Sequence, residues 1–68
     1  MFDAKKLKNC MEAQGVSERT LADAVGVSQS FINHLTKGFR QPQLSVAARI
    51  AGYFGKTVDE FIVKEGGQ

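Results

Sequence analysis

The sequence contains few of the side chains that catalysis or metal binding requires. Its 68 residues include one cysteine, one histidine and one tyrosine. Such a set offers no paired nucleophile and base and no metal-binding cluster, and the glycines do not form a G-x-G-x-x-G phosphate loop. We therefore expect no enzymatic activity, no cofactor and no metal ion. A domain of this size also has little room for a small-molecule pocket.

Cysteine pairs and long apolar runs are lacking as well. The single cysteine, Cys10, cannot form a disulfide within the chain, so we interpret it as a core thiol of a reducing compartment. No apolar run approaches the ~20 residues that would span a bilayer, and no signal peptide is recognisable. These absences predict a cytoplasmic protein with no membrane partner, whose stability comes from helix packing.

Acidic residues are missing from the middle of the chain. Residues 24–58 contain no Asp or Glu, but they include Lys37, Arg40, Arg49 and Lys56. The last segment has the opposite balance, with three acids and one lysine. Although the net charge is only +2, a basic segment of this kind attracts polyanions. Charge alone does not separate DNA from RNA or a membrane surface.

The residues that are present predict an all-α fold in a single domain. The hydrophobic content of 43% suffices for a compact core, and no segment alternates as a strand would. Capping residues and glycines separate the apolar stripes. We expect an ordered core at about residues 3–63 and a flexible tail at residues 64–68. The five expected helices cover about residues 3–14, 18–25, 29–37, 44–54 and 58–62.

Apolar residues at helical spacing identify the expected core. Asp3, Ser17 and Ser28 are placed to cap the first three helices, and Thr57 with Glu60 forms a capping-box pattern. The expected core comprises Leu7, Cys10, Met11 and Gln14, then Leu21, Ala22 and Val25, then Ile32 and Leu35 with Phe31 at the rim, then Leu44, Ala47, Ile50, Ala51 and Phe54, and finally Val58 and Phe61. The alternative for Phe31 is a contact with a thymine methyl group.

The helix expected at residues 29–37 has an exposed face without acids. Its short polar side chains include Gln29, Ser30 and Asn33, whereas an ordinary solvated face is rich in Glu and Lys. An amide side chain can donate and accept together, which matches the N6 and N7 atoms of adenine in the major groove. The pattern favours recognition of DNA bases, with plain solvation of the same residues as the alternative.

A sequence motif, G-V-S-x-S-x-I-x-x-L-x-x-G-x-R-x-P, runs from Gly26 to Pro42. It is followed by L-x-x-x-x-x-I-A-x-x-F, ending at Phe54, and by T-V-D-E-F, ending at Phe61. Together these segments resemble the Cro/lambda-repressor-type helix-turn-helix family, also called the XRE family, over about residues 4–62. The resemblance implies a five-helix, lambda-repressor-like domain whose third helix enters the major groove of double-stranded DNA. It also implies a prokaryotic, phage or mobile-element setting.

The resemblance assigns roles to individual residues. Gln29, Ser30 and Asn33 match the family's base-reading positions, and Lys37 and Arg40 match positions that hold phosphates. The full set of residues expected at the DNA backbone is Arg19, Thr20, Ser28, His34, Lys37, Arg40 and Arg49.

Some positions depart from the family or have a second interpretation. Glu18 stands where many members have Gln, and a carboxylate there would repel phosphate, so we expect it to favour the start of its own helix. Arg49 is either a backbone clamp or a solvated charge. His34 lies at the edge of the exposed face, where a phosphate or base contact competes with plain solvation.

Apolar residues beyond the expected core predict a dimer interface. They are Val46, Gly52, Tyr53, Ile62 and Val63. Gly52 lies within a helix, where glycine costs ~1 kcal/mol relative to alanine and would permit close helix approach. We expect a two-fold homodimer that places two recognition helices ~34 Å apart on DNA. Packing of these residues within one monomer is the alternative.

The sequence thus predicts a sequence-specific, double-stranded DNA-binding transcriptional regulator. We expect a repressor that binds an inverted-repeat operator as a homodimer. The alternative is an antitoxin-like or other protein-interaction module on a helix-turn-helix scaffold, with a protein partner that the sequence does not identify. That alternative predicts weak, salt-insensitive binding to DNA.

Overall fold

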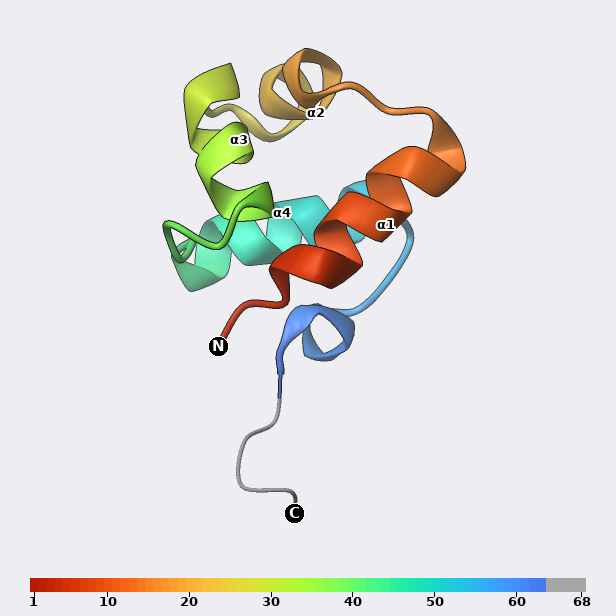
Figure 1. Cartoon of the computed structure of the whole chain (residues 1–68). Coiled ribbons are helices and arrows are strands. Elements are labelled where there is room, and N and C mark those ends of the chain that lie inside the picture. The colour runs from red at the N-terminus through yellow and green to blue at the C-terminus, as the bar shows by residue number, and fades with distance from the viewer. Residues whose placement is uncertain (64–68) are drawn as a thin grey trace.

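In the computed structural model, which describes residues 1–63, the chain forms four α-helices and one short 3-10 helix (Figure 1). The all-α expectation is confirmed for this part of the chain, but the expected count of five α-helices is wrong. The flexible tail expected at residues 64–68 lies outside the described residues. The elements are α1 (Ala4–Gln14), α2 (Glu18–Val25), α3 (Gln29–Thr36), α4 (Leu44–Tyr53) and η1 (Val58–Phe61).

The expected caps fix where the first three helices begin. Asp3 Oδ1 accepts a hydrogen bond from the Lys6 amide at 3.0 Å. Ser17 and Ser28 act in the same way at the starts of α2 and α3, where their hydroxyls accept from amides three residues later at 3.1 and 3.0 Å. Each side chain satisfies an amide that lacks a partner within its own helix. The first three helices therefore begin at the capping residues that the sequence predicts.

The last element is a 3-10 helix because the chain on either side of it is extended. The Glu60 carboxylate accepts from the Thr57 amide at 3.2 Å, as the capping-box pattern predicts. Ile62, however, has φ −110° and ψ 123° and forms an antiparallel bridge with Phe2. The Val63 amide donates to the Met1 carbonyl at 2.7 Å in the same pairing. The pairing with the N-terminal segment ends the helix after one turn, so the expectation that Ile62 is helical is wrong.

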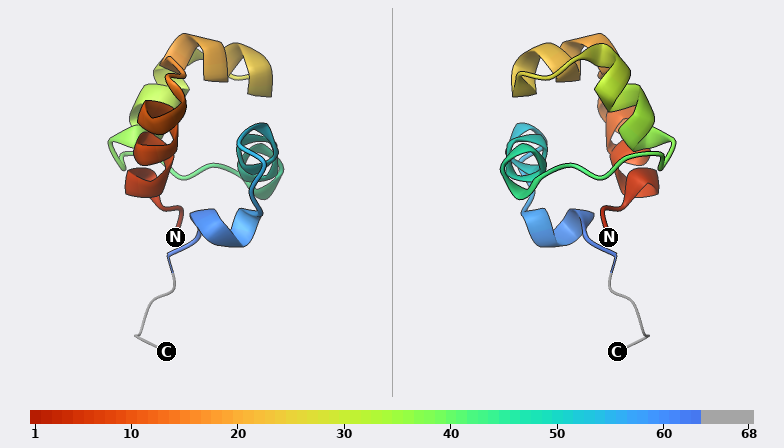
Figure 2. Two further views of the ribbon diagram at one scale, coloured as in Figure 1. Left: turned by 90° about the vertical axis from the view of Figure 1, so that its right-hand side faces the viewer. Right: turned by 90° about the vertical axis from the view of Figure 1, so that its left-hand side faces the viewer.

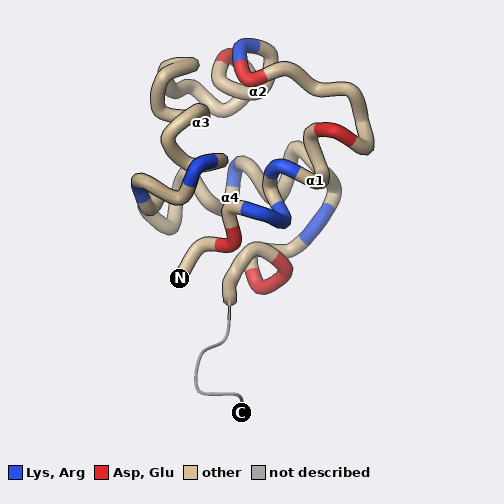
Figure 3. The backbone as a smooth tube through the Cα atoms, viewed as in Figure 1, with Lys and Arg blue, Asp and Glu red and all other residues tan. Residues whose placement is uncertain are grey.

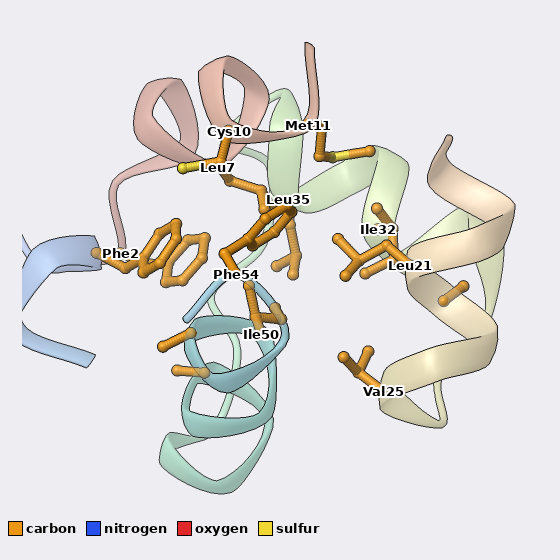
Figure 4. Packing of buried hydrophobic residues seen from close by; sticks show 14 residues of the cluster. Phe2, Leu7, Cys10, Met11, Leu21, Val25, Ile32, Leu35, Ile50 and Phe54 are labelled. Carbon is orange, nitrogen blue, oxygen red and sulfur yellow. The ribbon is translucent and has the colours of Figure 1, made fainter. Parts of the chain in front are cut away.

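The buried side chains form one cluster between the helices (Figure 4). Figure 2 shows α1 and α3 facing α4, with α2 at one end of the core and η1 at the other. The cluster comprises Phe2, Leu7, Cys10, Met11, Leu21, Ala22, Val25, Ile32, Leu35, Ala47, Ile50, Ala51, Phe54 and Phe61. No helix among the described residues is long and apolar enough to cross a membrane.

Gln14, Leu44 and Phe2 differ most from the expected core, whereas Val58 is half-buried against it. Gln14 and Leu44 are exposed, because they occupy the last residue of α1 and the first residue of α4, where each helix extends beyond the core. Phe2 is buried although the sequence did not predict it, and its ring stacks on Phe61 at 5.8 Å between centroids. Phe2 directly precedes the cap of α1, and Leu7 is the fourth helical residue. This spacing is typical of a hydrophobic staple and could have identified Phe2.

Candidate nucleic-acid interface

The turn between α2 and α3 holds the two helices in a fixed relation. Gly26 has φ 79°, a conformation that glycine adopts at little cost. The amides of Gly26 and Val27 both donate to the Ala22 carbonyl, at 2.9 and 3.0 Å, so the end of α2 is closed. Leu21 from α2 and Ile32 from α3 are both fully buried. The turn and the core together orient the polar face of α3 away from the protein.

The expected base-reading residues lie together on α3. Gln29 and Ser30 are exposed in its first turn, and Asn33 lies one turn later and is half-buried. Asn33 Nδ2 donates a hydrogen bond to Glu18 Oε2 in the first turn of α2 at 3.1 Å. The acid that departs from the family pattern is therefore bonded to one of the expected base-reading residues. This contact was not predicted, since the two residues are 15 positions apart.

Basic residues follow the same helix. Lys37 caps the C-terminus of α3 and Arg40 lies in the loop that comes next, where Figure 3 shows blue segments. The Arg40 guanidinium lies 5.5 Å from the centroid of the Phe31 ring, a cation–π distance that holds the side chain against α3. Phe31 is half-buried against the core, as expected for a residue at its rim. A cationic edge therefore adjoins the polar face.

Four more residues expected at the DNA backbone lie on α2 and α3 or directly before α3. Arg19 and Thr20 are exposed in the first turn of α2, and Ser28 is exposed at the start of α3. His34 is half-buried, and its ring lies 6.2 Å from that of Phe39 between centroids.

Arg49 differs from the other expected backbone contacts because its side chain donates a hydrogen bond to the main chain of another helix. Its Nη1 donates to the Val25 carbonyl at 3.2 Å, at the C-terminal end of α2. A guanidinium at this end satisfies a free carbonyl and complements the helix dipole. The hydrogen bond gives Arg49 a structural role that ties α4 to α2, which is an alternative to the phosphate contact expected from the sequence.

Replacing Arg49 by methionine is expected to lower the free energy of unfolding by about 1 kcal/mol, because the Val25 carbonyl loses its donor. The slope of log affinity for DNA against log salt should stay unchanged. Lys37→Met is the matched control: it should leave the free energy of unfolding within ~0.5 kcal/mol and reduce the slope by about 1. Urea unfolding and DNA titrations at several salt concentrations measure both quantities. A reduced slope in Arg49→Met would contradict the structural role.

A pocket of about 410 Å³ lies beside the start of α3. Val46, expected at a dimer interface, is half-buried in its wall. The lining residues are Val27, Ser28, Phe31, Arg40, Gln41, Gln43 and Val46.

The other residues expected at a dimer interface lie near the C-terminal end of the described chain. Tyr53 and Val63 are 40% and 39% exposed, which leaves apolar surface free for a partner. Ile62 is half-buried and paired with Phe2. A Cβ added at Gly52 would meet no atom within 4 Å, so close helix approach within the monomer does not require this glycine.

Comparison with known families identifies a helix-turn-helix family. The model of a family described as helix-turn-helix matches residues 7–61, from within α1 to the end of η1. The match includes α2, the turn, α3 and the loop that contains Arg40. It therefore includes Gln29, Ser30 and Asn33 on the polar face of α3. No curated protein matches the sequence.

Proposed function

We propose the following function for the chain, which belongs to the Cro/C1-type helix-turn-helix family, also called the XRE family. The model of this family matches residues 7–61 of the 68 residues in the chain. Proteins of this family are DNA-binding transcription regulators, and so is this chain at that level of description. The finer proposal is a cytoplasmic, sequence-specific repressor that binds an inverted-repeat operator as a homodimer. Its recognition helix is α3.

The observation that carries this proposal is the polar face of α3. Gln29 and Ser30 are exposed, the helix contains no acid, and Ser28 together with Gly26 fixes its direction. Amides and hydroxyls are the groups that make hydrogen bonds to base edges in the major groove. An acid-free helix meets no repulsion from phosphates. The face is therefore suited to enter a groove rather than merely to be solvated.

Phosphate contacts would come from the edges of this face. Lys37 and Arg40 supply charge beyond the C-terminal end of α3, and Arg19 supplies it at the start of α2. Each contact releases counterions, so affinity should fall steeply with salt. Repression by occlusion of a promoter requires binding alone and is the simplest output.

The experiment that tests the proposal is selection of bound duplexes from a random DNA library. We expect enrichment of an inverted repeat whose two half-sites are centred ~34 Å apart. Affinity for the enriched duplex should exceed affinity for a shuffled duplex at every salt concentration. If no sequence is enriched above bulk DNA, sequence-specific regulation is ruled out.

Dimerisation is a separate prediction. Replacing Val63 or Tyr53 by glutamate places a charge in the exposed apolar surface, so we expect sedimentation of monomers at concentrations where the unmodified chain forms dimers. Leu44→Glu is the matched control, because Leu44 is 73% exposed at the far end of α4. It should leave the dimer intact. If the dimer persists in both Val63→Glu and Tyr53→Glu, the interface lies elsewhere.

A protein-interaction module remains the second candidate, and two exposed apolar residues favour it. Phe39, in the loop between α3 and α4, is 72% exposed, and Leu44, the first residue of α4, is 73% exposed. Large exposed apolar side chains are more typical of a protein contact than of a phosphate contact. On this reading, Phe39→Ser would weaken a complex with another protein and leave DNA affinity unchanged.

A further inference from the structure

A side-chain hydrogen bond joins the two helices of the helix-turn-helix unit. Asn33 Nδ2, on α3, donates to Glu18 Oε2, on α2, at 3.1 Å. Both residues are half-buried. Glu18 is the acid in the first turn of α2, where the helix dipole favours a negative charge. The dipole of α2 thus stabilises the Glu18 carboxylate, which at the same time accepts a hydrogen bond from α3.

This pairing fixes the orientation of the Asn33 amide. A carboxylate accepts hydrogen bonds and donates none, whereas an amide has an acceptor oxygen on one side and a donor nitrogen on the other. The bond therefore forms only when Nδ2 faces Glu18. The flipped amide would place Oδ1 against the carboxylate, and the two oxygens would repel each other. Without such a partner, the terminal torsion of asparagine is broad and roughly two-fold.

The fixed amide keeps one donor and one acceptor for another molecule. Nδ2 carries two hydrogens, of which Glu18 takes one, and Oδ1 remains free to accept. An N–H group beside a carbonyl oxygen is the complement of adenine N7 and N6 in the major groove. Because the orientation is set before binding, less freedom is lost when the base is met.

We propose that Glu18 is a positioning residue for base recognition, whose carboxylate fixes the Asn33 amide so that this side chain selects adenine at one base pair of each half-site. This inference rests on the proposed function of α3 as the recognition helix. Glu18 also brings a negative charge close to the DNA backbone. The same residue therefore raises discrimination at one position and lowers affinity for all sequences.

Three substitutions separate these two effects. Glu18→Gln keeps the size and the acceptor but adds a donor, so either orientation of Asn33 can pair with it. Glu18→Ala removes the partner, and Asn33→Ala removes the reader. Asn33→Ala identifies the base pair that Asn33 reads in the selected operator. Replacing this base pair lowers the affinity of the unmodified chain but not the affinity of Asn33→Ala. The measurement is the ratio of affinities for the operator and for the duplex changed at this base pair, alongside thermal unfolding of each variant.

We expect the unmodified chain to discriminate about tenfold or more at this base pair. Glu18→Ala and Glu18→Gln should each lose most of that ratio at this base pair alone, while their affinity for a shuffled duplex rises. Adding Glu18→Ala to Asn33→Ala should change the ratio no further, since both act through one contact. A merely structural role for Glu18 would instead reduce discrimination at every position.

Asp23→Asn is the matched control. Asp23 is an exposed acid on the same helix, so its removal tests the loss of charge without touching Asn33. It should raise affinity for all duplexes and leave every ratio unchanged. The proposal is overturned if Glu18→Gln keeps the full ratio, or if Glu18→Ala and Asn33→Ala act at different base pairs. If the unmodified chain enriches no sequence at all, the proposed function itself fails, which is a distinct result.

Discussion

Replacing Gln29 and Asn33 together by alanine is expected to abolish the preference of the chain for its selected operator. Each bidentate amide contact is worth about 1–3 kcal/mol of discrimination. The loss of both should therefore lower the ratio of operator to shuffled-duplex affinity by about a hundredfold or more. Affinity for the shuffled duplex should change little, because the residues expected at phosphates are still present.

The matched control is the double variant Asn9→Ala and Gln14→Ala. These residues have the same two side-chain types, and both are exposed on α1. Removing them should leave the affinity ratio unchanged. Fluorescence anisotropy with labelled duplexes at one fixed salt concentration measures two affinities for each protein, one for the operator and one for the shuffled duplex. Retention of the preference in the Gln29 and Asn33 double variant would mean that α3 does not recognise bases.

Replacing Phe61 by alanine is expected to unfold the domain at room temperature or to bring it close to unfolding. Phe61 is fully buried, and its ring lies 5.8 Å from that of Phe2 and 6.3 Å from that of Phe54. Truncation of a buried phenylalanine costs about 3–5 kcal/mol. A domain of this length has a total stability of roughly 3–10 kcal/mol. One side chain in a four-residue element therefore accounts for a large part of the stability.

Urea unfolding followed by circular dichroism measures this effect. Phe39→Ala is the control, because Phe39 is 72% exposed, and its midpoint should differ little from that of the unmodified chain. Similar midpoints for the two variants would show that η1 does not contribute to the core. DNA binding by Phe61→Ala should fall in parallel with its folded fraction, since Phe61 lies in η1 and not on α3.

Local signals in the sequence predicted most of the fold. The caps at Asp3, Ser17 and Ser28 and the left-handed glycines at Gly15 and Gly26 act over a few residues, and the structure has them at the expected places. The stripes of buried residues on α1, α2, α3 and α4 are determined in the same way, by helical periodicity. Such features could be predicted because each depends on neighbours along the chain.

The features that sequence reasoning missed depend on residues far apart in the chain. Ile62 leaves the expected helix because it pairs with Phe2, 60 positions away. Arg49 meets the Val25 carbonyl, and Asn33 meets Glu18, only once the helices have packed. The polar face of α3 could be predicted from its composition, whereas the partner that orients Asn33 could not.

The most direct test of the account is an NMR titration of the ¹⁵N-labelled chain with its selected duplex. We expect the largest shifts at the amides of α3 and at the side-chain NH₂ groups of Gln29 and Asn33, with smaller shifts at Lys37 and Arg40. The exposed residues Asn9 and Gln14 of α1 should stay unchanged. Largest shifts on α1, or equal shifts with a shuffled duplex, would contradict the claim that α3 recognises the base sequence.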